Sequence, residues 1–179
     1  MKTAPPNEIE LTMDELREIS RWAILCANQV ISIYESQVPD DLRPRDAIAA
    51  ADEFVKTGKR SNALRMAGLA AYKASRGVAD NVAASEAALA ATQAVGAAYL
   101  HPIPSSLQVK HILGSAAHAM SVIEMSTGQE KAEDFYNWAL KNSPATVGKV
   151  LARFPSAPTG GGRTGEIIRR FDDALRAGR

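Results

Sequence analysis

The sequence has few of the features on which secreted or membrane proteins depend. It contains a single cysteine, Cys26, so no internal disulfide can form and a disulfide-stapled extracellular fold has no support. No stretch approaches the roughly 20 apolar residues of a membrane-spanning helix, and residues 1–10 lack the apolar core of a signal peptide. The net charge of +1 gives no general attraction to nucleic acid. We therefore expect a cytoplasmic protein that binds neither a membrane nor nucleic acid.

The residue patterns of common catalytic sites are also missing. No Gly-x-Ser-x-Gly turn occurs, and the cysteine lies in an apolar helical stripe, where packing explains it. The glycines at 160–162 precede a helix and could bind an anion through backbone amides. They lack the lysine of a phosphate-binding loop, so a flexible linker is the preferred interpretation. We predict that the protein is not an enzyme and needs no cofactor.

The chain is rich in alanine, and its apolar residues have helical periodicity. Apolar residues recur at spacings of three and four along nearly the whole sequence, and alanine favours helices strongly, so we predict an all-α protein. It should be a single-domain bundle of about seven or eight closely packed helices. The predicted helices span about 12–37, 44–57, 61–76, 80–100, 106–125, 129–141, 144–154 and 166–177.

Particular residues predict where several of these helices begin and which side of each is buried. Thr12 and Glu15 have the spacing of a capping box, and Ser61 and Asp80 are suitable caps for later helices. The first helix carries its apolar stripe at Leu16, Ile19, Ala23, Cys26, Val30 and Ile33. The third helix should turn Leu64, Gly68, Ala71, Tyr72 and Ser75 to one side.

The helices divide the chain into three parts. Residues 1–11 are expected to be a loose N-terminal arm, and residues 12–128 form the helical core. Residues 129–179 supply further helices, separated by a glycine- and proline-rich linker at 155–165.

Two histidines are candidates for a ligand site. His111 and His118 are seven residues apart, so they share a helix face at about 10.5 Å along the axis, too far apart for one metal ion. We expect no metal, and half-buried, hydrogen-bonded histidines are the preferred interpretation. The alternative is a ligand pocket that both histidines line together with acids or tyrosines.

A charged corner between the first two predicted helices is the richest segment. Asp40 and Asp41 precede the helix start, where acids complement the positive end of the helix dipole. Arg43 and Arg45 can each clamp a carboxylate with two hydrogen bonds. A rigid, salt-bridged corner is the preferred interpretation, and a charged recognition patch is the alternative.

This corner also carries a resemblance to a known family. The run Asp41-Leu42-Arg43-Pro44-Arg45-Asp46-Ala47-Ile48, followed by alanine-rich helices, resembles the immunity proteins of bacterial polymorphic toxin systems, in particular the immunity-five-like domain. The segment from Ile19 to Tyr34 is similar to the first helix of that family. The resemblance implies an all-helical cytoplasmic protein that binds and neutralises a cognate toxin, and it brings no catalytic residues.

Three functions are therefore open. The preferred one is a protein-binding module of the immunity type, which would bind through an exposed surface such as the charged corner. The second is a helical homodimer or other assembly protein, and the third is a small ligand-binding protein that uses His111 and His118.

Overall fold

The computed structural model describes residues 8–178, and every regular element in this range is helical. The prediction of an all-α fold is therefore confirmed. A 3-10 helix at Ser106–Gln108 leads into the sixth α-helix. The α-helices of the described chain are α1 (Met13–Asn28), α2 (Ile31–Gln37), α3 (Arg43–Thr57), α4 (Asn62–Gly77), α5 (Val82–Ala98), α6 (Val109–Thr127), α7 (Gln129–Lys141), α8 (Ala145–Leu151) and α9 (Gly162–Arg176).

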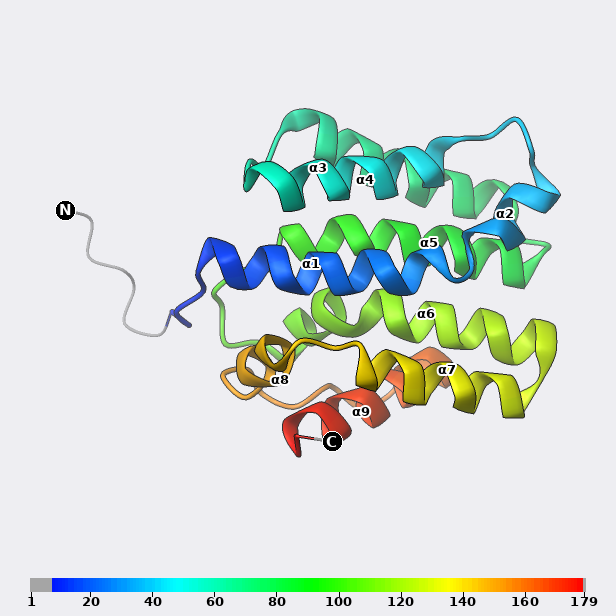
Figure 1. Ribbon diagram of the computed structural model, residues 1–179. Coiled ribbons are helices and arrows are strands. Elements are labelled where there is room, and N and C mark those ends of the chain that lie inside the picture. The colour runs from blue at the N-terminus through cyan, green and yellow to red at the C-terminus, as the bar shows by residue number, and fades with distance from the viewer. Residues whose placement is uncertain (1–7, 179) are drawn as a thin grey trace.

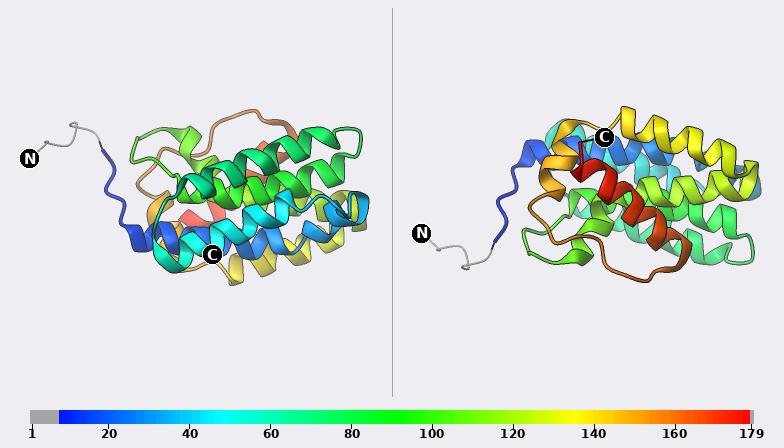
Figure 2. Two further views of the ribbon diagram at one scale, coloured as in Figure 1. Left: turned by 90° about the horizontal axis from the view of Figure 1, so that it is seen from above. Right: turned by 90° about the horizontal axis from the view of Figure 1, so that it is seen from below.

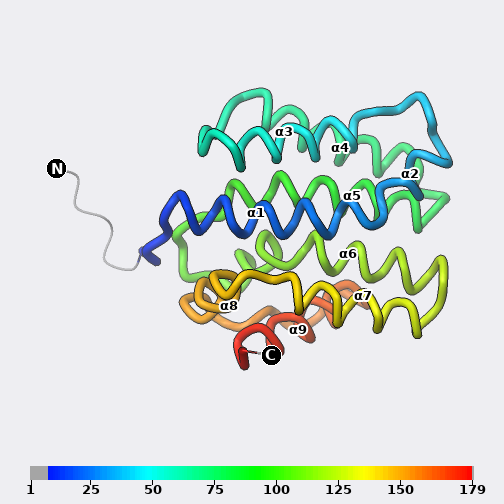
Figure 3. The backbone as a smooth tube through the Cα atoms, viewed as in Figure 1, coloured from blue at the N-terminus to red at the C-terminus, as the bar shows by residue number. Residues whose placement is uncertain are grey.

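The helices are stacked in tiers. Figure 1 shows α3 and α4 at one end of the stack, α1 and α5 beneath them, and α7, α8 and α9 at the opposite end beyond α6. Seen from above, α3 and α4 lie side by side over α1 and α5 (Figure 2). The tube in Figure 3 shows α1 between the two outer tiers of the stack. In the described range no helix is long and apolar enough to cross a membrane.

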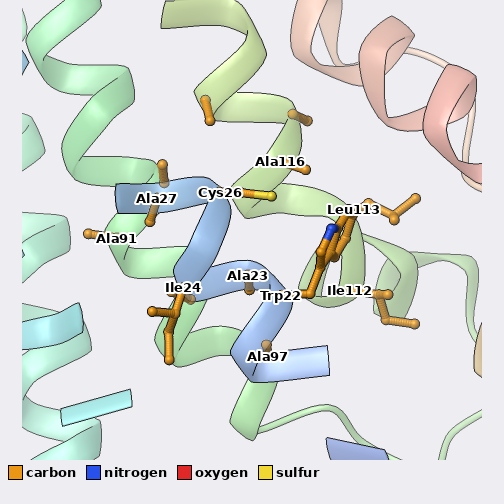
Figure 4. Close-up of a cluster of buried hydrophobic side chains, with 14 of the residues drawn as sticks. Trp22, Ala23, Ile24, Cys26, Ala27, Ala91, Ala97, Ile112, Leu113 and Ala116 are labelled. Carbon is orange, nitrogen blue, oxygen red and sulfur yellow. The ribbon is translucent and has the colours of Figure 1, made fainter. Parts of the chain in front are cut away.

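The middle of the stack is built from small side chains. Nine residues of α5 are buried, and all but Val95 are alanines. α6 contributes Ile112, Leu113 and Ala116 to the same core, which Figure 4 shows meeting Trp22, Ala23 and Cys26 of α1. Small side chains let helix axes approach closely, and close packing raises the number of favourable dispersion contacts.

The first predicted helix is wrong in one respect, because it is two helices. The capping box is present, with Thr12 accepting a hydrogen bond from the Glu15 amide and Glu15 accepting one from the Thr12 amide. The chain then leaves the helical conformation at Val30, whose φ is −127° and ψ −9°. The break changes the register, so Ile31 and Tyr34 are buried after it, whereas Ile33 is only partly buried.

Two further local predictions need correction. Asn81, not Asp80, caps α5, because its side-chain oxygen accepts the Ala84 amide at 3.0 Å. Tyr72 does not join the buried face of α4 and is 49% exposed. The buried face of α4 consists of Leu64, Gly68, Ala71, Ala74 and Ser75, and Tyr72 lies outside it.

The C-terminal helices are tied to the middle tier by specific contacts. Trp22 Nε1 of α1 donates to the carbonyl of Ala139 in α7 at 3.0 Å, and its ring meets the edge of Phe171 in α9. Figure 2 shows α9 crossing beneath the bundle, obliquely to α7. The segment before α9 is held as well, since the amide of Ala157 donates to Asp172 at 2.8 Å.

The N-terminal arm was predicted over residues 1–11, and residues 1–7 of it lie outside the described part. Ile9 packs against the core, and its amide donates to the Pro102 carbonyl at 2.9 Å. Leu11 is also partly buried against the core.

Candidate functional site

The charged corner lies where the chain turns from α2 into α3. α2 ends at Gln37, and α3 begins at Arg43 with Pro44 in its first turn, where proline costs no helical hydrogen bond. Asp41 closes the turn, because its own amide donates to the Val38 carbonyl at 3.0 Å. The break between α1 and α2 directs the end of α2 toward this turn.

Asp41 is the hub of the corner. Its carboxylate accepts the Tyr34 hydroxyl at 2.5 Å and two guanidinium hydrogen bonds from Arg43 at 2.8 and 2.6 Å. It also accepts the backbone amide of Arg43, which satisfies a free donor at the start of α3. The guanidinium holds the pKa of Asp41 well below its usual range, and burial together with this carboxylate raises the pKa of Tyr34 to about 12.

Arg45 makes the second clamp. Its guanidinium donates to both carboxylate oxygens of Glu35, at 2.7 and 2.8 Å, and so fastens α3 to α2. This planar, two-point contact suits arginine and would not be reproduced by lysine. The hydrogen bonds to Glu35 raise the pKa of Arg45 further. Asp40 is exposed and forms no ion pair within the described residues.

The corner is therefore built as a salt-bridged joint. Both predicted arginines have carboxylate partners, although each keeps 45% of its side chain exposed. Leu42 lies between them with 57% exposure. Charges that neutralise each other leave little unpaired charge to attract a partner, so a binding role for Asp40, Asp41, Arg43 and Arg45 stays a prediction.

The two histidines have different surroundings. His118 Nδ1 lies 2.7 Å from Glu86 Oε2 of α5, and both side chains are mostly buried. His111 packs over Gly96, where an added Cβ would lie 3.0 Å from its Nδ1. That nitrogen is buried without a hydrogen-bond partner, and burial, with a smaller effect of His101, lowers the pKa of His111.

Only one of these histidines lines the cleft beside α9. The cleft has a volume of about 290 Å³ and is lined by His118, Lys110, Gln93, Thr164 and the turn at 158–161. His111 is not part of its lining, so the structure does not bring the pair into this pocket. Within residues 8–178, no group of three or more metal-ligating side chains is placed to hold a metal ion.

Sequence reasoning missed the partners of the corner. Tyr34 and Glu35 lie in α2, after the helix break, and nothing in their spacing assigns them to Asp41 and Arg45. The polar residues of the corner could be found from sequence, whereas their pairing could not.

The exposed face of α4 was also missed. Met66, Leu69 and Tyr72 are about half exposed on this helix, each three residues from the next. Their spacing was visible in the sequence as part of an apolar pattern, but an apolar pattern alone does not reveal which members remain uncovered.

Comparison with family models agrees with the resemblance found in the sequence. A family model described as "Imm-5 like putative immunity protein" matches residues 10–146. Comparison with curated proteins and with solved structures found no match. The family match runs from just before the capping box of α1 into the start of α8, which is well over half of the sequence. The chain therefore belongs to the Imm-5 like immunity protein family.

Proposed function

We propose that the protein is an immunity protein that binds a cognate toxin directly in the cytoplasm and thereby neutralises it. The observation that carries the proposal is the family match, which includes α1 to α7 and the charged corner. Membership of an immunity family favours binding over catalysis and favours a protein as the partner.

The physical character of the molecule supports the same proposal. Large side chains of the core come from helices distant in sequence, and the rings of Trp22 in α1 and Phe171 in α9 pack against each other. The carboxylates of Asp41 and Glu35 fasten α3 to the preceding turn and helix. A rigid scaffold loses little conformational freedom on association, so its surfaces are suited to tight binding.

Co-expression tests this proposal. A toxin domain from the same genome would be expressed in a bacterial host with and without the protein, and growth would be measured. We expect the toxin domain alone to stop growth, and the protein to restore it and to co-elute with an inactive toxin domain in size-exclusion chromatography. Continued growth arrest together with separate elution would contradict the proposal.

A further inference from the structure

The outer face of α4 presents an uncovered apolar strip. Met66 is 54% exposed, Leu69 47% and Tyr72 49%. Successive members are three residues apart, so they lie on one side of the helix. Single exposed apolar residues are ordinary on protein surfaces, but a strip of three large ones on one helix face is typical of an interaction site.

The same face carries positive charge. Arg65, Lys73 and Arg76 are exposed on α4, and an ideal helical repeat places all three within the arc that the apolar strip occupies. The sequence from Lys59 to Ala79 contains five basic residues and no acidic residue. Within residues 8–178, none of the ion pairs involves a cation of α4. The charge on this face is therefore available to a partner, unlike the paired charge at the corner.

The inner face explains why the outer face stays uncovered. α4 packs through Gly68 and other small residues, and an added Cβ at Gly68 would lie 2.8 Å from Val95 of α5. Leu64 is the large side chain buried on this inner face, and Met66, Leu69 and Tyr72 remain on the outer side. α4 lies in the end tier of the stack, with α3 beside it and α5 beneath it, as Figures 1 and 2 show.

We infer that the outer face of α4 is the docking surface for an acidic protein partner whose carboxylates surround an apolar patch. The inference rests on the proposed function, and the partner it assigns is the cognate toxin. Tyr72 and the two arginines, Arg65 and Arg76, belong to the residue types that dominate binding energy at protein interfaces. Cations around the apolar strip would speed association with an acidic surface and exclude basic ones.

The test uses two kinds of variant on the α4 face. Arg65→Glu/Lys73→Glu/Arg76→Glu reverses its charge, and Leu69→Ala/Tyr72→Ala removes apolar contact area. The control Arg21→Glu/Lys141→Glu/Lys149→Glu makes the same change in net charge at exposed cations of α1, α7 and α8. Circular dichroism would verify that all variants are folded.

Affinity for an inactivated variant of the toxin domain found by co-expression would be measured by calorimetry. We expect each α4 variant to weaken binding by about tenfold or more, with the charge reversal less damaging at high salt, and the control to change affinity by less than about threefold. If the wild-type protein binds and the α4 variants bind equally well, the docking surface is wrong while the proposed function stands. If the wild-type protein does not bind the toxin domain, both the docking surface and the proposed function are wrong.

Other occupants of the face give distinct results. Anionic lipid vesicles, a single-stranded oligonucleotide and the protein at increasing concentration would be tested with the same variants. Association with any of these that the α4 variants abolish, while their affinity for the toxin domain is unchanged, would overturn the inference. We expect no such association at physiological salt.

Discussion

The carboxylate of Asp41 links several groups of the charged corner. Its carboxylate is 13% exposed and accepts hydrogen bonds from Tyr34, from the backbone of Arg43 and from the Arg43 guanidinium. Neighbouring Asp40 is exposed and has none of these contacts. The two adjacent acids therefore form a natural comparison between a structural carboxylate and a solvated one.

Asp41→Asn should destabilise the protein by about 1–2 kcal/mol at pH 7, because the ion pair and its charged hydrogen bonds are lost. The pKa of Asp41 is lower in the folded state, so its stabilising effect is complete well above pH 4 and is lost as the pH falls through the folded pKa. The difference between variant and wild type should therefore shrink in acid. Urea denaturation at pH 7 and pH 3 measures it. The role would be refuted if Asp40→Asn lost as much free energy of unfolding as Asp41→Asn. It would also be refuted if the difference in free energy between Asp41→Asn and wild type did not depend on pH.

Cys26 gives a second prediction at the residue scale. Its side chain is fully buried beside Ala116 (Figure 4), and burial raises the pKa of its thiol above the ordinary range. A thiolate is the reactive form, so Cys26 should not react with a disulfide reagent in the native protein and should react fully in denaturant. Stoichiometric labelling within seconds under native conditions would mean that the Cys26 side chain is not buried against α6.

At the scale of elements, helical periodicity predicted most of the fold because each helix buries a stripe. The stripe that the spacing predicts for α1 is buried at Leu16, Ile19, Ala23 and Cys26. The break at Val30 left no comparable signal, because no proline or glycine marks it. Since that break brings Glu35 to Arg45, the pairing in the candidate site could not be predicted either.

The packing of α4 on α5 depends on a glycine inside a helix. An added methyl group at Gly68 would meet Val95 at 2.8 Å, so Gly68→Ala should destabilise the protein by about 1–3 kcal/mol despite the better helix propensity of alanine. Gly77 ends the same helix with no atom within 4 Å of an added Cβ. Gly77→Ala should thus be neutral or stabilising by up to about 1 kcal/mol. Thermal denaturation of both variants measures the contrast, and equal melting temperatures would contradict the close approach of α4 and α5.

At the scale of the whole molecule, the contacts of Trp22 link α1 to both α7 and α9. The sequence contains one other tryptophan, Trp138, which lies in α7. The two can therefore report on different tiers of the stack. Sequence periodicity predicted that these helices exist, but it could not predict which would meet, because contacts between distant helices depend on the three-dimensional arrangement.

We expect the whole chain to unfold in one transition, because Trp22 joins α1 to the C-terminal helices through both a buried hydrogen bond and an aromatic contact. Trp138→Phe leaves Trp22 as the reporter for fluorescence, while circular dichroism follows all helices. The two urea transitions should coincide. Separate midpoints would show that the C-terminal helices unfold independently.

The central claim is that the protein acts by occupying a partner's surface and not by catalysis. Titrating the purified, active toxin domain with this protein tests the claim most directly, with residual toxin activity measured after two different incubation times. We predict that inhibition is complete at one molecule of protein per molecule of toxin and is the same at both times. Inhibition by a small fraction of an equivalent that deepens with time would show turnover and contradict the account.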